Sequence, residues 1–304
     1  MNLIGQYKNG NYTVSIYDDG TKIRENDLDF FEPAFPESMD IKITNACDMM
    51  CPFCHEASTP NGKHGDILHL PFIDTLHPYT ELAIGGGNPL SHPDLIPFLT
   101  RLKERKLIPS MTVNQVHFLK NVELLRDLSE RKLIYGLGVS YISGSTSEDR
   151  RLLIENMKGI PNAVLHIING VVPFQELEEL AHHGFKILIL GYKDFRRGSA
   201  NLKDNRDSIH SNQQALFVAL PYIISNQWFS CVSFDNLAIR QLDVRQLMSE
   251  QEWRQFYMGD DGGFTMYVDA VNREYAVCSV SENRHKLTDD SGEMFQIVQS
   301  EVKK

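Results

Sequence analysis

Three of the five cysteines of this 304-residue chain lie within a short stretch, with the spacing Cys47-x3-Cys51-x2-Cys54. They follow the run IKIT at 41–44, which is typical of a short buried strand. An odd number of cysteines does not fit a disulfide framework, whereas several thiols on one loop are typical of a metal centre. The sequence therefore predicts a metal-binding loop at the end of a strand.

Two kinds of metal centre fit three clustered thiols. Three thiolates can ligate three irons of a four-iron cluster, which leaves the fourth iron free to bind a cofactor. The alternative is a structural zinc ion whose fourth ligand is His55, His64 or His69. Zinc ribbons usually use paired two-residue spacings, so the three-then-two spacing favours the iron-sulfur cluster.

The chain from Met39 onward predicts an α/β fold. Segments with apolar residues at helical spacing separate six short apolar runs, so we expect parallel strands joined by right-handed crossovers. A closed barrel needs eight such units, so six predict a partial, TIM-like (β/α)6 barrel or, equally well on periodicity, an open doubly wound sheet. The six runs are residues 41–44, 81–84, 111–113, 135–142, 163–168 and 186–190.

The two ends of the chain are expected to be additions to this core. Residues 1–38 predict an N-terminal β-hairpin, because an alternating apolar run precedes the turn Asp18-Asp19-Gly20. Residues 39–198 contain the barrel, and residues 199–304 predict an α+β extension that covers the open side of the sheet. This extension is expected to contain a strand within 229–242, a second hairpin about Asn272-Arg273 and a mobile polar tail after Asn283.

Composition and charge limit the partners. The net charge is -10, and no basic run is longer than the pairs Arg196-Arg197 and Lys303-Lys304, so nucleic acid is not an expected partner. No stretch approaches the ~18 apolar residues of a membrane span, and the first residues lack an apolar segment behind a basic start. We therefore expect a cytoplasmic protein without a membrane partner.

The cysteine spacing, with the aromatic Phe53 directly before the third cysteine, resembles the signature of the radical S-adenosylmethionine (radical SAM) superfamily. The resemblance covers residues 39–195 and implies a partial barrel of six strand-helix units. It implies that Cys47, Cys51 and Cys54 hold a [4Fe-4S] cluster, that SAM chelates the open iron and that Phe53 packs by the adenine. An external one-electron reductant of flavodoxin or ferredoxin type would reduce the cluster. The 5′-deoxyadenosyl radical released from SAM would then abstract a hydrogen atom from a substrate.

The second predicted strand ends in Gly85-Gly86-Gly87-Asn88, and glycines at a strand end allow a backbone to approach a ligand closely. This segment resembles the family motif that binds the amino group of SAM. Asn88 stands where glutamate is usual; its amide oxygen can accept a hydrogen bond but carries no charge. The resemblance implies further cofactor contacts at the ends of the later strands, from Asn114, Ser140, Asn169, Leu190 and Tyr192.

The sequence leaves two hypotheses for the substrate, a peptide or protein residue and a small metabolite. Only Cys231 and Cys278 lie outside the motif, too few to hold a full second cluster without other ligands. The long segment after the sixth strand favours an elaborated substrate pocket over a bare activase of another enzyme. The first hypothesis is a peptide or protein residue as the substrate, since the C-terminal hairpin offers an edge for an extended peptide. The alternatives are a radical SAM enzyme acting on a small metabolite, and a non-catalytic metal-binding module.

Cys231 is the candidate catalytic residue beyond the barrel. A thiol is a good hydrogen-atom donor, and some radical SAM peptide epimerases use such a cysteine to quench the substrate radical. Cys278 competes for this role, and the alternative is that both thiols are small buried apolar groups. The donor hypothesis requires Cys231 to point toward the SAM site.

Overall fold

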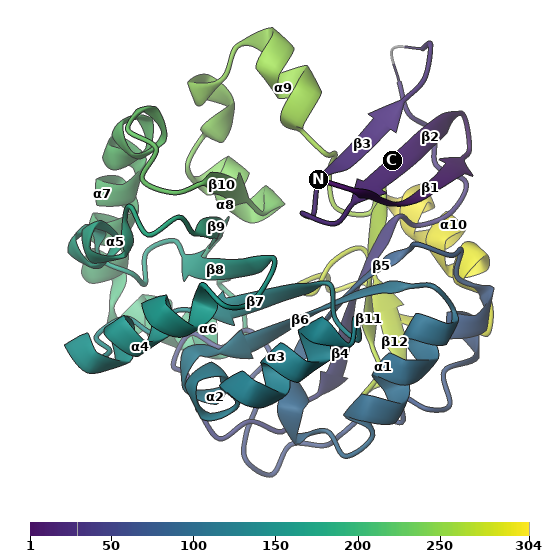
Figure 1. The fold of residues 1–304 in the computed structure, drawn as a ribbon, viewed down its shortest axis with the longest axis horizontal. Coiled ribbons are helices and arrows are strands. Elements are labelled where there is room, and N and C mark those ends of the chain that lie inside the picture. Colours follow the sequence, from purple (N-terminus) through teal and green to yellow (C-terminus); the bar gives the residue numbers. More distant parts are fainter. Residues whose placement is uncertain (29, 304) are drawn as a thin grey trace.

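The computed structural model describes residues 1–28 and 30–303 and shows an open sheet of ten strands in the order β10-β9-β8-β7-β6-β5-β4-β11-β12-β13. Its centre is six consecutive parallel strands, and each overlaps one of the six predicted runs (Figure 1). They are β4 (Ser38–Thr44), β5 (Glu81–Gly86), β6 (Ile108–Asn114), β7 (Gly136–Ser140), β8 (Ala163–Ile168) and β9 (Lys186–Leu190).

Helices connect these strands as the apolar spacing predicts. No helix among the described residues is both long and apolar enough to span a membrane. In chain order the connecting helices are η2 (Pro89–Ser91), α1 (Leu95–Glu104), α2 (Gln115–Lys120), α3 (Val122–Glu130), α4 (Ser147–Met157) and α5 (Phe174–Leu180), and α6 (Arg197–Asp204) and α7 (Arg206–Ser225) follow β9.

The strand registers give the sheet two chemically different faces. On one face, aliphatic side chains such as Ile41, Val139 and Ile187 are buried in one continuous core with the helices. The opposite face, here called the polar face, carries mainly small and polar side chains on β4 to β7, whereas β8 and β9 add aliphatic ones such as Val164 and Leu188. Most side chains of this face are exposed or half-buried. Both faces of a parallel sheet are usually apolar, so this asymmetry leaves one face suited to binding polar groups. The polar face includes Asp40, Lys42, Gly85, Ser110, Thr112, Asn114, Ser140, His166, Leu190 and Tyr267.

The first crossover departs from the predicted pattern, because it contains the cysteine loop and the 3-10 helix η1 (Pro71–Thr75) and no α-helix. The C-terminal helix α10 (Ser291–Val302) packs against η1 and β11. Met294, Phe295 and Val298 of α10 are 0% exposed. The prediction of a mobile tail after Asn283 is therefore wrong. The tail forms helix α10, whose apolar side chains are buried against the rest of the protein.

The C-terminal extension lengthens both edges of the sheet. The predicted late strand, β10 (Cys231–Phe234), adds in parallel to β9, and β11 (Thr265–Asp269) adds in parallel to β4. The predicted hairpin is confirmed, since β12 (Glu274–Ala276) runs antiparallel to β11. The remaining elements are α8 (Asn236–Gln241), η3 (Val244–Leu247), α9 (Glu250–Phe256) and β13 (His285–Lys286).

The α/β class with a parallel sheet is confirmed, and the sheet is not closed, as expected for six units. The extension was expected to cover the open side of the sheet, whereas it adds strands to the sheet at both edges. The hairpin edge expected to receive an extended peptide is covered in part, because β13 pairs with Glu274 and Tyr275 of β12.

The N-terminal residues form a separate three-stranded antiparallel sheet, purple in Figure 1. β2 (Tyr12–Tyr17) and β3 (Lys22–Glu25) are the predicted hairpin, and β1 (Leu3–Asn9) pairs with the other side of β2. The buried positions of β1 are Gly5, Tyr7 and Asn9, so its apolar pattern is too weak to predict a strand.

Glu37, directly before β4 and 0% exposed, ties the small sheet to the large one. Its carboxylate accepts hydrogen bonds from the hydroxyl of Tyr12 and from Nε of Arg24 at 2.8 Å. Nζ of Lys22 lies 3.4 Å from the same carboxylate. The buried charge thus has cationic and hydrogen-bonding partners on both β2 and β3.

We predict that Glu37→Gln lowers the free energy of unfolding by about 3–5 kcal/mol, because it leaves the buried guanidinium of Arg24 without a carboxylate partner, whereas Lys22 keeps its ion pair with Glu81. Urea unfolding of the variant measures this loss. Glu25→Gln, at an exposed position of β3, is the matched control and should change stability by less than about 0.5 kcal/mol. An equal change in the free energy of unfolding for the two variants would contradict the role of Glu37 in joining the two sheets.

Candidate functional site

The three motif cysteines lie on a compact loop beyond the carboxyl end of β4. The two arms of the loop pair with each other, since the N–H of Cys47 donates to the carbonyl of Thr59 at 2.8 Å and the N–H of Thr59 donates to Asn45 at 3.1 Å. A turn brings the N–H of Cys54 to the carbonyl of Cys51 at 3.2 Å. All three thiols are free and half-buried, so they are accessible to a metal centre.

The thiols fit a multinuclear cluster better than a single ion. Ligands of one zinc ion at ~2.3 Å lie about 4 Å apart. Among the described residues, however, the three thiols do not form a set of ligand atoms within 4.8 Å of one another. Each thiolate of a four-iron cluster binds a different iron, so the sulfurs need not converge. Burial raises the pKa of the Cys47 and Cys51 thiols, so metal binding must release protons.

The histidines considered as a fourth zinc ligand have other contacts. Nδ1 of His64 lies 2.8 Å from the hydroxyl of Thr44, and Nδ1 of His69 lies 2.8 Å from a carboxylate oxygen of Asp66. Nε2 of His55 lies 3.5 Å from a carboxylate oxygen of Glu56. The geometry therefore does not favour the zinc site considered from the sequence.

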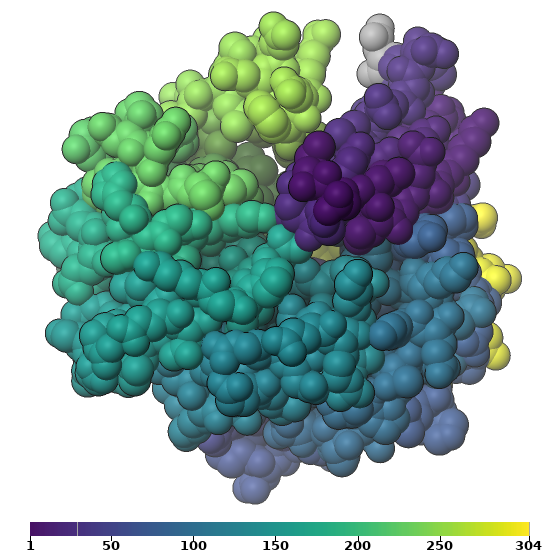
Figure 2. Space-filling model, viewed as in Figure 1, coloured from purple at the N-terminus to yellow at the C-terminus, as the bar shows by residue number. Residues whose placement is uncertain are grey.

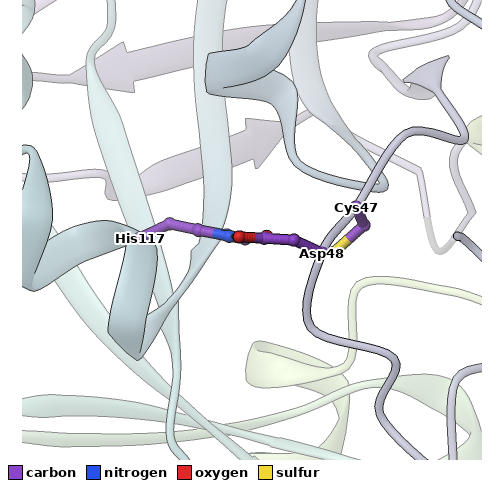
Figure 3. A group of neighbouring side chains, drawn as sticks. All are labelled: Cys47, Asp48 and His117. Carbon is purple, nitrogen blue, oxygen red and sulfur yellow. The ribbon is translucent and has the colours of Figure 1, made fainter. Parts of the chain in front are cut away.

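A different pair stands next to Cys47. Nε2 of His117, on α2, lies 2.6 Å from Oδ1 of Asp48, and the hydrogen bond from His117 lowers the pKa of Asp48. Their ligand atoms and the thiol of Cys47 lie within 4.8 Å of one another (Figure 3). The pair holds the start of the cysteine loop against α2.

The glycine motif permits the cysteine loop to lie against the end of β5. The N–H of Gly87 donates to the carbonyl of Thr44, and that of Asn88 to the carbonyl of Ala46, both at 2.7 Å. A Cβ atom on Gly87 would stand 2.3 Å from the oxygen of Ala46. A Cβ on Gly85, in contrast, would meet nothing within 4 Å. Gly87 is therefore needed for the loop, whereas Gly85 borders open space on the polar face.

Two arginines at the start of α6 hold the other side of the loop. Arg197 donates from Nε to the carbonyl of Cys51 at 3.1 Å and from Nη1 to the carbonyl of Ser58 at 2.9 Å. Arg196 donates to the carbonyl of Glu56 at 3.0 Å. Arg196 and Arg197 thus link the segment after β9 to the cysteine loop.

The predicted cofactor contacts do lie at one edge of the sheet, at the carboxyl ends of successive parallel strands, but several side chains are already engaged. Asn88 and Asn114 accept hydrogen bonds from the N–H groups of Leu90 and Val116 and so cap short helices. Ser140 is half-buried on the polar face, as is Leu190, and the half-buried Phe53 lies beside Gly198 of α6.

Two of the predicted contact residues, Asn169 and Tyr192, form hydrogen bonds with Gln241 of α8. Asn169 is 0% exposed, and its Nδ2 donates to Oε1 of Gln241 at 3.1 Å. The backbone N–H and carbonyl of Tyr192 also bond to Gln241, and the Tyr192 hydroxyl donates to Gly198. These placements support no direct cofactor contact from Tyr192.

Cys231 does not lie where a donor to the SAM site is required. It is the first residue of β10 and stands level with Lys186, the first residue of β9, whereas the cysteine loop follows the carboxyl end of β4. The ammonium of Lys186 bonds to the carbonyl of Asp19 in the N-terminal sheet. Cys231 is also exposed, so neither the donor hypothesis nor its buried alternative fits this thiol.

A buried ionic network beneath the cysteine loop escaped the sequence analysis. Nζ of Lys42, 1% exposed, lies 2.7 Å from Glu56 of the loop and 3.0 Å from Asp269 of β11. The Tyr267 hydroxyl donates to Glu56 at 3.0 Å, and burial raises its pKa. The signal was present in β4, where Asp40, Lys42 and Thr44 alternate with aliphatic residues.

Comparison with known proteins identifies the fold. No family model matches the chain, and no curated protein matches it in sequence. The crystal structure of Streptococcus suis SuiB bound to precursor peptide SuiA matches with a TM-score of 0.57 at 14% identity, over 89% of this chain and 67% of that chain. SuiB bound to S-adenosylmethionine matches with a TM-score of 0.56 at 14% identity, over 89% and 68%.

A third structure, of SuiB itself, matches with a TM-score of 0.53 at 16% identity, over 88% of this chain and 66% of that chain. The chain therefore has the fold of SuiB and spans about two thirds of its length. This fold agrees with the resemblance to the radical SAM superfamily that was drawn from the cysteine spacing.

We predict that Gly87→Ala destabilises the protein by about 1–3 kcal/mol, since its Cβ would force the backbone of the cysteine loop away from β5. Thermal unfolding measures the effect. Gly85→Ala is the matched control, because its Cβ meets open space, and it should unfold at nearly the wild-type temperature. A larger loss for Gly85→Ala would contradict the packing described.

Proposed function

We propose that the chain is a radical SAM enzyme that binds a [4Fe-4S] cluster through Cys47, Cys51 and Cys54. The observation that carries the proposal is the set of three accessible thiols at the carboxyl edge of a parallel sheet, on a loop that is hydrogen-bonded to the glycine-rich end of β5. Ligands of open α/β sheets bind at this edge. The shared fold with SuiB, one of whose structures contains S-adenosylmethionine, supports it.

The residues around the loop would position the cofactors. When bound, the cluster supplies the electron that cleaves SAM. Arg197 and Gly87 hold the two sides of the cysteine loop, and Gly85 leaves room for SAM. A flavodoxin- or ferredoxin-type protein in the cytoplasm would serve as the external reductant.

We infer a peptide or protein substrate on the polar face. A SuiB structure with a bound precursor peptide supports this choice over a small metabolite. The polar face also suits a peptide backbone, because Ser110, Thr112 and Ser140 offer hydroxyl groups along successive strands. Burial lowers the pKa of His166 to about 4, so its imidazole is neutral there at pH 7 and can donate or accept a hydrogen bond.

Anaerobic reconstitution with iron and sulfide, followed by reductant and SAM, tests the proposal directly. The wild-type protein should bind four irons per chain and release 5′-deoxyadenosine. Cys51→Ala should lose the cluster and the product, since it removes one of three protein ligands. Cys231→Ala is the matched control and should retain both, because this thiol lies at the amino end of β10. Product formation by Cys51→Ala would refute the assignment.

Gly85→Ala separates SAM binding from folding. Because the added methyl group would point into open space, we predict a normal fold and iron content but SAM binding weakened at least about tenfold. Equilibrium dialysis with labelled SAM measures the affinity. Unchanged affinity would place SAM away from Gly85.

One observation favours a second function, a mononuclear metal site. Cys47, Asp48 and His117 bring three ligand atoms within 4.8 Å of one another, as a zinc ion requires. Such a site would contain one zinc ion per chain, and His117→Gln would remove it. Metal analysis of the protein as purified distinguishes this site from a four-iron cluster, which His117→Gln should leave in place.

A further inference from the structure

Lys193 joins three segments that are far apart in the chain. It follows β9, and its ammonium donates to the hydroxyl of Ser279, in the segment after β12, at 2.9 Å. The same Nζ lies 3.4 Å from Nε2 of His55 in the cysteine loop. The half-buried Lys193 thus stands between the end of β9, the loop that carries the motif cysteines and the C-terminal extension.

The cations around Lys193 have partners of their own. Lys42 contacts the carboxylates of Glu56 and Asp269, and Nη1 of Arg196 lies 3.5 Å from Glu56. Arg284 donates to the carbonyls of Ser279 and Ser281, and its guanidinium lies 5.0 Å from the centre of the Tyr267 ring. The two carboxylates of this group, Glu56 and Asp269, are therefore shared among the neighbours of Lys193.

Lys193 lacks such a partner. Within residues 1–28 and 30–303, no carboxylate oxygen lies within 4.0 Å of its ammonium, whose two neighbours are a hydroxyl and an imidazole. Asp40 is the nearby acid, but it is exposed, and its carboxylate makes no ion pair with Lys193 within 4.0 Å.

Partial burial of the Lys193 ammonium is unfavourable, because no ion pair offsets the desolvation of its charge. A ligand with one negative charge would complete it. The ammonium and the hydroxyl of Ser279, both able to donate, form a two-point receptor of the size of a single carboxylate. The group borders the cysteine loop, so a bound carboxylate would hold the substrate next to the candidate SAM site.

We propose that Lys193 and Ser279 bind a carboxylate of the substrate peptide, and so select peptides with an acidic group near the reacting residue. This inference rests on the proposed function as an enzyme that acts on peptides. The carboxylate has two possible sources, an Asp or Glu side chain and the C-terminus of the peptide. Both present the same two oxygens to Lys193.

Ligand-observed NMR with the reconstituted protein tests the site without requiring SAM cleavage. The probes are acetyl-Gly-Glu-Gly-amide, its Gln counterpart, and acetyl-Gly-Gly-Gly with a free carboxylate. Wild type should bind the Glu probe at least about tenfold more tightly than the Gln probe, as expected when a charge-assisted hydrogen bond replaces a neutral one. Binding of the free-carboxylate probe in preference to the Glu probe assigns the site to a C-terminus.

Lys193→Met should remove the preference for the Glu probe, and Ser279→Ala should reduce it. Lys203→Met, at an exposed position of α6, is the matched control and should leave it unchanged. Equal binding of the Glu and Gln probes, no binding of any probe at millimolar concentrations, or an unchanged preference in Lys193→Met overturns the proposal. Loss of SAM affinity in Lys193→Met would instead assign the cation to the SAM carboxylate, which also overturns it. Release of 5′-deoxyadenosine by wild type keeps the proposed function intact in each case.

Discussion

The interaction on which the candidate site depends is the buried contact of Lys42 with Glu56 and Asp269. It joins β4, the cysteine loop and β11, so a single ammonium fixes the loop to two adjacent strands. Leaving one member of such a group unpaired in the interior is costly, typically about 3–5 kcal/mol, and the three side chains therefore stabilise one arrangement. The C-terminal extension is thereby part of the site, since it supplies Asp269.

The two faces of the sheet divide the tasks of folding and binding. Aliphatic residues on one face pack against the helices and provide the hydrophobic core. The other face lacks that layer, so half-buried hydroxyl groups such as those of Ser110, Thr112 and Ser140 remain available for binding. A polar face contributes less to stability than the apolar face that is usual in a parallel sheet. Binding of a polar substrate and cofactor would explain why this face is polar.

Local patterns in the sequence predicted much of this structure. The six central strands and the two hairpins follow from apolar periodicity and turn residues, and the cysteine spacing identified the site loop. The strand β1 could not be predicted, because Gly5 and Asn9 occupy buried positions where apolar residues are expected. Helix α10 was misjudged because its partner, η1, lies over 200 positions earlier in the chain, as the bond between Thr75 and Ser291 shows.

Local sequence patterns could not predict which side chains contact one another across the sheet. The position of Cys231 depends on the register of β10 against β9, and that of Glu56 on a contact with Lys42 and Tyr267. Such pairings are set by tertiary packing and carry no short-range signal. The braces at Arg196 and Arg197 have the same origin, because their acceptors are backbone carbonyls, which any sequence offers.

Electron paramagnetic resonance of the reconstituted, reduced protein, recorded before and after SAM is added, tests the central claim most directly. If Cys47, Cys51 and Cys54 hold a four-iron cluster with an open iron, the reduced protein should show the signal of a [4Fe-4S]+ centre, and SAM should change that signal by binding to the iron. A protein that acquires no such signal, or whose signal SAM leaves unaltered, would contradict the account.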